Sequence, residues 1–304
     1  MEQTDQTVSF LTCLFTQEPL RLLNETELGV VNEKIANNEL CFFEGSPCYQ
    51  PLKKAYSTNQ YLHIYPEIDG ILYLKKASTV VSKNRVEFPL HRRDKTENDL
   101  FYRSLGFVED TSTLNNKKVI RLSNQELKEF KSRLRKKVDL LFTSNAASVD
   151  DILNLTYGMN IKSHIHADHD LVRLRAIQTN IPQHVTSILI DQDHIPVSSD
   201  QIDSFVNFEP IDLMEKERQL SFYHLLKSVL TFNGIMVSAY DLRSNLYLEK
   251  QLLSDIRKKN ALSFITPWKK SFLPKMYFIE VGQSYESFMS NSGHLKRSLT
   301  KQLG

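Results

Sequence analysis

The sequence predicts an α/β fold in which a parallel sheet follows a small N-terminal α+β domain. After residue 138, short apolar runs alternate with amphipathic segments, which is the pattern of successive βαβ units. Before residue 80, short apolar runs are separated by turn sequences such as PEIDG at 66–70. The chain has 304 residues and is 41% hydrophobic, which is enough for about two domains with ordinary cores.

Three regions follow one another along the chain. The N-terminal domain is expected to span 1–80 and to hold a helix over TELGVVNEKIA (26–36). A linker at 81–137 should contain a helix-like segment, ENDLFYRSL, and a strongly basic helix, NQELKEFKSRLRKK (124–137). The third region, 138–304, alternates strands and helices. Its expected strands are VDLLF, IKSHIHA, VTSILI, QIDSFVNF, GIMVSAY and KMYFIEV, and its expected helices are SVDDILNL, DLVRLRAIQ and EKERQLSFYHLLKSVL.

Charge and cysteine content exclude several classes of protein. Lysine and arginine (38) nearly balance aspartate and glutamate (36), so no global field attracts the chain to nucleic acid or to a membrane. The odd number of cysteines, Cys13, Cys41 and Cys48, argues against a disulfide framework. The N-terminus has no basic segment followed by an apolar one, and no run of about 18 apolar residues occurs. We therefore expect a cytoplasmic protein with no membrane partner.

Residues 185–240 resemble the second half of a class I, type-11-like methyltransferase domain, a family that uses S-adenosylmethionine (SAM). VTSILIDQDHIPVSSDQIDSFVNFEPI is similar to the family's strand, acidic residue, L-P-F turn, D-x-x-F-D segment and next strand, with Asp191, Ile195, Pro196 and Asp203 at matching positions. The following helix and strand are similar to those of the family, with Phe232, Asn233 and Gly234 at the intervening turn. The resemblance implies a Rossmann-like methyltransferase sheet and a bound SAM.

The same resemblance assigns a cofactor site at the carboxyl ends of the strands, where ligands bind in such folds. VDLLFTSNAAS occupies the place of the first strand and the glycine-rich loop, with Thr143, Asn145 and Ala147 where the family has glycines. These residues are small, and asparagine tolerates positive φ, so we expect weakened rather than abolished cofactor binding. Asp168 matches the acid that holds the ribose hydroxyls, and Asp191 the acid near the adenine amine. The candidate cofactor residues are Thr143, Ser144, Asn145, Ala147, Asp168, His169, Asp191 and Gln192, and no catalytic base is identifiable.

The N-terminal 75 residues resemble the small zinc-ribbon-like proteins that activate methyltransferases. FLTCLFTQEPLRLL is similar to their opening L-x-C-P-x-C-x-G-P-L, and LHIYPEIDGILYL to their closing Y-P-I-x-D-G-I-P-x-L. A zinc ribbon needs paired thiolates, but Thr16 stands where the partner of Cys13 is expected. We therefore expect a small α+β domain without zinc.

Two further patterns offer alternatives. HIHADH at 164–169 has the ligand spacing of a metallo-β-lactamase zinc site, and the other reading places its histidines along the end of a strand. The basic helix carries Lys128, Lys131, Arg133, Arg135, Lys136 and Lys137, which would either contact RNA phosphates or form a solvated face.

Three functions follow from these observations. The first is an active SAM-dependent methyltransferase on an unidentified acceptor. The second is a methyltransferase-like protein that has lost turnover and serves as a binding subunit for a protein partner, in a homodimer or a heterodimer. The third is an RNA-binding module that uses the basic helix. The altered glycine loop and the incomplete cysteine pair favour the second.

Overall fold

The computed structural model describes residues 9–85, 124–191, 194–208, 225–226, 228–241, 262–267 and 276–282. The chain divides into two compact units. The first unit contains Met1–Ile120, Ala147–Ile152 and Ser163–Ser198, and the second contains Arg121–Ala146, Leu153–Lys162 and Ser199–Gly304.

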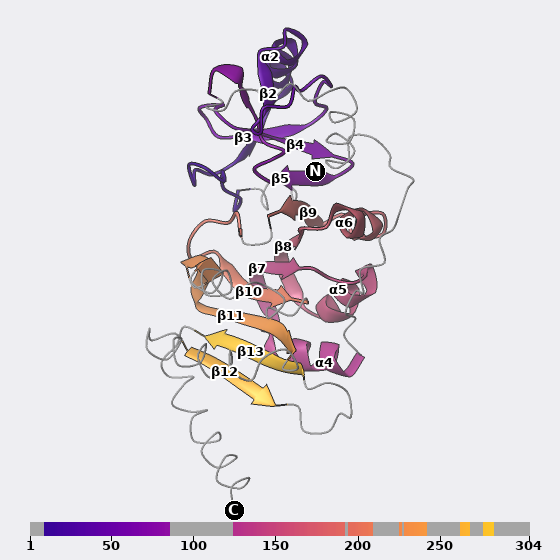
Figure 1. The fold of residues 1–304 in the computed structure, drawn as a ribbon. Coiled ribbons are helices and arrows are strands. Elements are labelled where there is room, and N and C mark those ends of the chain that lie inside the picture. Colours follow the sequence, from indigo (N-terminus) through magenta and orange to yellow (C-terminus); the bar gives the residue numbers. More distant parts are fainter. Residues whose placement is uncertain are drawn as a thin grey trace, which may run out of the picture. The chain divides into compact units, whose positions relative to one another are not determined.

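The first unit begins with one helix over a group of short antiparallel strands (Figure 1). Helix α2 (Glu25–Ala36) starts with a capping box, in which the Asn24 side chain accepts from the Glu27 N–H and the Glu27 carboxylate accepts from the Asn24 N–H. Its buried residues Val31 and Ile35 join the apolar core of this part of the unit. The strands are β1 (Arg21–Leu22), β2 (Leu40–Phe42), β3 (Ala55–Ser57), β4 (Ile64–Ile68) and β6 (Val80–Ser82), and the 3-10 helix η1 (Lys83–Arg85) follows.

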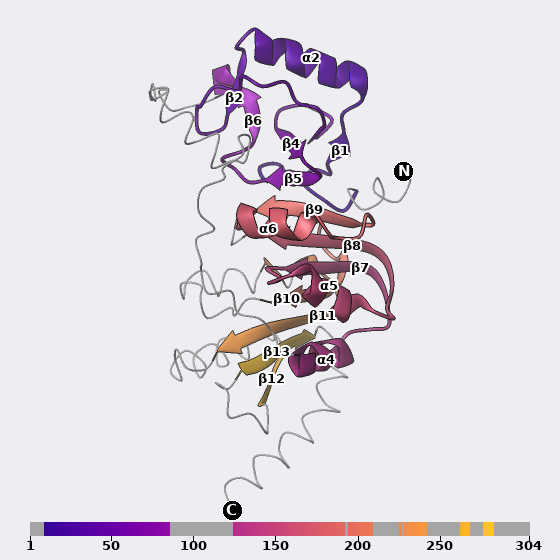
Figure 2. The same cartoon turned by 90° about the vertical axis from the view of Figure 1, so that its right-hand side faces the viewer.

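A tight hairpin connects these antiparallel strands to a parallel sheet within the same unit. Strand β4 turns into β5 (Ile71–Leu74) through Asp69 and Gly70, which have φ values of 52° and 77°. An Asp-Gly pair with positive φ at both positions is typical of a two-residue hairpin. Strand β5 then pairs in parallel with β9 (Val185–Ile190), as Figure 2 shows. The N-terminal residues therefore contribute a strand to the parallel sheet.

A βαβ element completes the first unit. Strand β8 (Asn160–Asp168), which belongs to this unit from Ser163 onward, leads through α6 (Leu171–Gln178) to β9, and the two strands pair in parallel. Leu174 of α6 packs in one buried cluster with Ile71 and Tyr73 of β5 and Leu189 of β9. The strand order in this unit is β1-β3-β4-β5-β9-β8.

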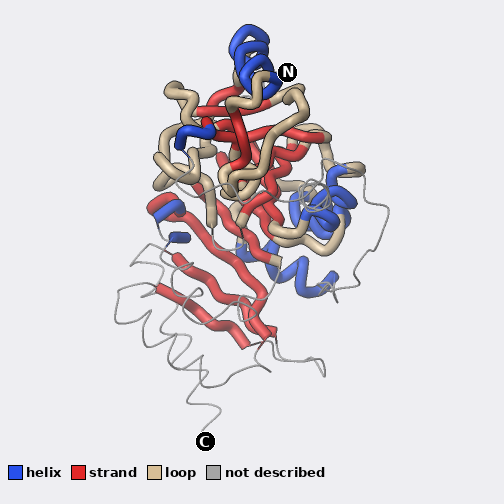
Figure 3. Tube along the Cα trace, turned by 45° about the horizontal axis from the view of Figure 1, so that its top comes forward, coloured by secondary structure: helices blue, strands red, loops and turns tan. Residues whose placement is uncertain are grey.

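The second unit is built on three parallel strands followed by two antiparallel ones. Figure 3 draws the strands as red tubes and the helices as blue tubes. Its strand order is β7-β10-β11-β13-β12, with the rings of Phe142 and Phe205 stacked between β7 and β10 at 5.3 Å. Helix α4 (Asn124–Arg133) precedes β7, and α5 (Val149–Thr156), which belongs to this unit from Leu153 onward, follows it. The strand bounds are β7 (Lys137–Ser144), β10 (Ile202–Asn207), β11 (Leu230–Asp241), β12 (Leu262–Pro267) and β13 (Met276–Gly282).

The fold is α/β and Rossmann-like, because parallel strands alternate with helices along β7-α5-β8-α6-β9. The expected strands after residue 138 and the helices at 148–155 and 170–178 are confirmed. The turn expected at 232–234 is instead a register shift inside β11, between Leu230 and Ile235. The segment 97–105 and most of 215–230 lie outside the described residues. In the part of the chain that is described, no helix has the length and apolar character needed to cross a membrane.

Candidate functional site

The carboxyl ends of three parallel strands of the first unit lie at one edge. Leu74 at the end of β5 is aligned with Ile190 at the end of β9, and Asp168 at the end of β8 is aligned with Leu189. Lys75, Asp168 and Asp191 therefore lie at the same edge. In an open α/β sheet this is the edge where ligands bind.

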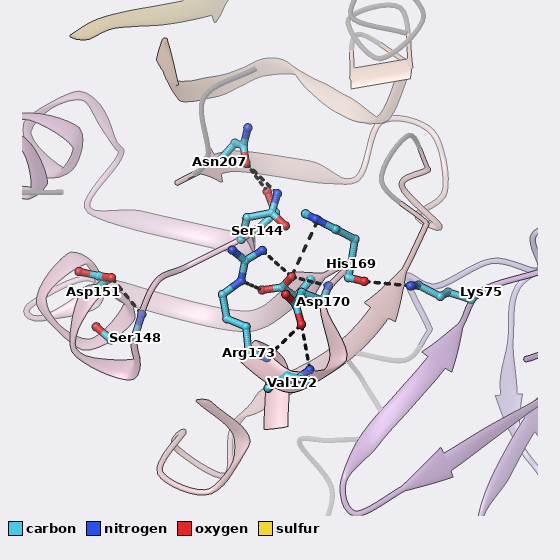
Figure 4. Close-up of polar contacts among 11 residues, drawn as sticks. Lys75, Ser144, Ser148, Asp151, His169, Asp170, Val172, Arg173 and Asn207 are labelled. Atoms are coloured by element: carbon cyan, nitrogen blue, oxygen red, sulfur yellow. Dashed lines mark hydrogen bonds and ion pairs between the residues drawn. The ribbon is translucent and has the colours of Figure 1, made fainter. Parts of the chain in front are cut away.

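Asp168 is fully buried and its carboxylate already has cationic and neutral donors. Figure 4 labels the two donor residues, Arg173 and Asp170. The Arg173 guanidinium donates from Nε to Oδ2 at 2.6 Å and from the second terminal nitrogen to Oδ1 at 2.7 Å. The backbone N–H of Asp170 also donates to Oδ1, at 2.8 Å. The pair is a bidentate, charge-assisted interaction that engages both oxygens of the expected ribose acceptor.

The start of α6 places Arg173 against Asp168. Asp170 is the N-cap, and its side chain accepts from the N–H groups of Val172 and Arg173. Arg173 lies in the first turn, and helical side chains are directed toward the N-terminus, so its guanidinium reaches back to the end of β8. His169 lies between Asp168 and the N-cap Asp170 in the chain. Its Nδ1 is 3.9 Å from Asp168 Oδ1, and its side chain is partly exposed.

The second predicted anchor, Asp191, also accepts a hydrogen bond from the protein. Its Oδ2 accepts from the backbone N–H of Lys76 at 3.2 Å. The neighbouring Lys75 donates from Nζ to the carbonyl oxygen of His169 at 2.9 Å. Burial lowers the pKa of Lys75, and the carboxylates of Asp191 and Asp168, with that of Asp170, partly oppose this effect. The segment that follows β5 thus contacts the edge of the first unit that carries Asp168 and Asp191.

His164 and His166 lie on the same face of β8 as Asp168, since successive side chains alternate along a strand. Burial lowers the pKa of His164 to about 3, with further lowering by His166 and His184. Burial also lowers the pKa of His166 to about 4, although Asp168 raises it. Both imidazoles are neutral at physiological pH. Among the described residues, no group of three His, Cys, Asp or Glu side chains could hold a metal ion.

The second unit holds most of the predicted glycine-loop positions. Thr143 and Ser144 end β7 and are buried, and Asn145 follows with a φ of 57°. The Asn207 side chain at the end of β10 accepts from Ser144 Oγ at 3.0 Å and from Asn145 Nδ2 at 3.1 Å. Asn145 therefore adopts the left-handed conformation for which glycine is the usual residue, and Asn207 holds it there.

Ala147 and Gln192 are the remaining predicted cofactor positions. Ala147 is half-buried in the loop that precedes α5, just before Ser148, whose N–H donates to Asp151 Oδ2 at 3.1 Å. This bond satisfies one of the N–H groups at the start of the helix. Gln192 lies outside the described residues.

Aromatic rings surround Cys13 in the N-terminal part of the first unit. The Cys13 sulfur lies 3.2 Å from Tyr65 Oη and 3.6 Å from His63 Nδ1. The ring of Phe15 stacks on His63 at 4.4 Å and lies 4.7 Å from Phe43. Burial raises the pKa of Tyr65, so its hydroxyl stays protonated. The cysteine that the zinc-ribbon resemblance singled out thus lies close to a phenol and an imidazole ring.

Sequence reasoning missed Arg173, Lys75 and Asn207. Arg173 carries a signal in retrospect, because it lies five residues after Asp168 and just inside a helix. Lys75 follows an apolar strand, and Asn207 ends another. Polar residues at the carboxyl ends of parallel strands are candidates for a site even when no family motif includes them.

Comparisons with known proteins add little beyond the fold. No protein-family model matches the chain, and no curated protein matches its sequence. Among solved structures, the complex of the Haloferax volcanii Trm112 methyltransferase activator with a methyltransferase has a TM-score of 0.43 at 11% identity, over 52% of this chain and 88% of that one. A SAM-dependent methyltransferase from Aquifex aeolicus has a TM-score of 0.40 at 8% identity, over 53% of this chain and 90% of that one. The N-methyltransferase NodS from Bradyrhizobium japonicum has a TM-score of 0.41 at 11% identity, over 52% of this chain and 93% of that one. Similarities of this size do not bear on the function of this chain.

Proposed function

We propose that this chain is a methyltransferase-like protein that has lost cofactor turnover and acts as a binding subunit for a protein partner. The observation that carries the proposal is the Arg173–Asp168 pair. The acid that the family resemblance assigns to the ribose hydroxyls is buried, and a guanidinium in its own chain engages both of its oxygens.

The internal pair competes with a ribose for Asp168. Separating the partners of a buried ion pair costs about 3–5 kcal/mol, because a buried charge is left without its counterion. A hydrogen bond to a charged group contributes about 1.5–3 kcal/mol. Two ribose hydroxyls that replaced Arg173 would supply about 3–6 kcal/mol, which is roughly cancelled by the penalty of separating the pair. The internal pair therefore removes most of the binding free energy that Asp168 could give to a nucleoside.

The second acid supports the same conclusion. Asp191 Oδ2 accepts from the backbone N–H of Lys76, and Lys75 lies beside it at the same edge. Both acids that the resemblance assigns to the cofactor thus stabilise the chain itself. A methyltransferase-like fold that keeps its acids for internal contacts is suited to a structural or binding role.

Equilibrium dialysis with labelled SAM and S-adenosylhomocysteine tests the proposal. We expect no saturable binding by the wild-type chain at ligand concentrations up to about 1 mM. The isosteric Asp168→Asn variant tests the assigned anchor, and Lys34→Ala, at an exposed position on α2, serves as the matched control. Micromolar binding that Asp168→Asn abolishes and Lys34→Ala preserves would overturn the proposal.

That outcome would favour the alternative, an active SAM-dependent methyltransferase. One observation favours it: Asn145 has a φ of 57° at a position where the family has glycine. The backbone there keeps a conformation suited to close approach of a cofactor. An acceptor screen would then follow from the dialysis result.

The role of a binding subunit has its own measurements. Sedimentation velocity over a concentration series separates a homodimer from a monomer that requires a different partner.

The proposed domains are 1–80 and 138–304, with a linker at 81–137. The first of them is proposed to be a zinc-free counterpart of the activator family. Elemental analysis for zinc on wild type and Cys13→Ser tests this, and one equivalent of zinc in the wild type alone would contradict it. Cytoplasmic location stays a prediction.

A further inference from the structure

The second unit has a basic surface that the proposed function does not use. Helix α4 buries Leu127 and Phe130, and the buried Leu134 follows directly after its last residue, Arg133. The Phe130 ring packs against Phe208 with centroids 6.3 Å apart. Lys131 comes one residue after Phe130 and four after Leu127, so it lies at the margin of this buried face and is half-buried, whereas Lys128 is exposed.

More lysines gather where the first strands of this unit begin. The carbonyl oxygen of Lys136 accepts from the N–H of Asn160 at 2.8 Å, which brings the start of β7 next to the start of β8. Lys136 and Lys137 are exposed, and so is Lys162, two residues after Asn160. Arg133 and Arg135 add positive charge to the same stretch, and Asp139 is an exposed acid within it.

An exposed aromatic ring lies among these cations. Tyr157 is 81% exposed at the end of α5, where Gly158, with a φ of 71°, ends the helix. Lys131 donates from Nζ to the Tyr157 carbonyl oxygen and lies 5.2 Å from the ring centroid. This contact orients the ring without burying it. Tyr157 differs from a singly exposed side chain in that a cation of the same surface holds its ring in place.

We propose that this surface, formed by Lys131, Lys136, Lys137, Lys162 and Tyr157 and called here the basic edge, binds single-stranded nucleic acid. The lysines contact phosphates, and Tyr157 stacks on an unpaired base. Sites for single strands combine these two components, a positive track for the backbone and an aromatic side chain for the bases.

The basic edge is separate from the predicted cofactor loop. Within the second unit, Lys137 begins β7 and Ser144 ends it. Eight residues of strand span about 23 Å. The basic edge therefore lies at the amino end of β7, whereas ligands of the Rossmann type bind at carboxyl ends. Loss of cofactor binding and presence of nucleic-acid binding are independent outcomes.

Fluorescence anisotropy with a labelled oligouridine of about 15 nucleotides tests the inference on the full chain. We expect saturable binding that weakens with salt. If about three phosphates are contacted, raising salt from about 50 to about 200 mM lowers the affinity about 20-fold. The triple variant Lys136→Glu, Lys137→Glu, Lys162→Glu should lose binding at the higher salt.

Two further variants separate stacking from charge. Tyr157→Ala should weaken binding about fivefold or more, the lower range for one stacked base, while Tyr157→Phe should keep the wild-type affinity. The control Lys34→Glu, Lys53→Glu makes the same kind of charge reversal at exposed positions of the first unit and should bind like wild type.

Several results would overturn the inference. They are no binding at the lower salt, an equal loss in the control, or unchanged binding by Tyr157→Ala. Tighter binding of a duplex of the same length would also overturn it, because Tyr157 has no unpaired base to stack on in a duplex.

Discussion

The guanidinium of Arg173 bonds to both carboxylate oxygens of Asp168, at 2.6 and 2.7 Å, five residues apart in the chain. Asp168 is fully buried and the side chain of Arg173 is 14% exposed. This pair joins the end of β8 to the first turn of α6, and it engages the carboxylate that the family resemblance assigns to the cofactor.

Removing the cation of this pair should destabilise the chain strongly. Arg173→Ala leaves a buried carboxylate without its counterion, and we expect the free energy of unfolding to fall by about 3–5 kcal/mol. Urea unfolding measures this, with Lys34→Ala as the exposed control. The double variant Asp168→Leu, Arg173→Met should recover most of the loss, because no buried charge remains. A double variant that is no more stable than Arg173→Ala would contradict the assignment.

Acid should destabilise the chain through its buried histidines. The pKa values of His164 and His166 are lowered from 6.5 to about 3 and about 4 in the folded state. Below pH 6.5 the unfolded chain takes up protons that the folded chain excludes, so stability is fully present above 6.5 and falls as the pH drops toward 4. Urea unfolding at a series of pH values measures the slope. The His164→Gln, His166→Gln variant should have a flatter slope than wild type over that window, and an unchanged slope would reject these groups as its cause.

The register shift in β11 should make Gly234 intolerant of a side chain. A Cβ atom there would lie 2.8 Å from the Ile202 carbonyl oxygen and 2.9 Å from that of Thr231, both backbone atoms. We expect Gly234→Ala to cost about 1–3 kcal/mol, the usual range for overpacking. Gly29→Ala is the matched control, because no atom lies within 4 Å of its Cβ position and it lies inside α2. That change should stabilise by up to about 1 kcal/mol. Equal effects at the two glycines would contradict the packing described for β11.

The positive φ of Asn145 should determine how much different substitutions at this residue destabilise the chain. Asn145→Gly keeps the positive φ and loses one hydrogen bond to Asn207, so we expect a change within about 1 kcal/mol. Asn145→Val places a β-branched residue in the left-handed region and should cost about 1–3 kcal/mol. Thermal unfolding of the two variants checks the order, and the reverse order would exclude the left-handed conformation at this residue.

Local sequence patterns predicted the alternating elements well. The runs VDLLF, VTSILI and QIDSFVNF all form strands, and SVDDILNL and DLVRLRAIQ form helices. These patterns depend on side-chain periodicity over a few residues, which can be read without knowing the partner elements. The small irregularity in β11 was missed, because Phe232 to Gly234 carries a turn signal that strand pairing overrides.

The sequence by itself determined the α/β succession of elements and the presence of acids at the ends of two parallel strands. Only the tertiary structure decided what those acids contact. Lys76 and Asp191 are 115 residues apart, and they meet because β5 adds to the sheet beside β9. Arg173 is close to Asp168 in sequence, but its choice of that carboxylate follows from burial at the end of β8. Charges select partners by distance and desolvation in the folded chain, and neither quantity is encoded in residue spacing alone.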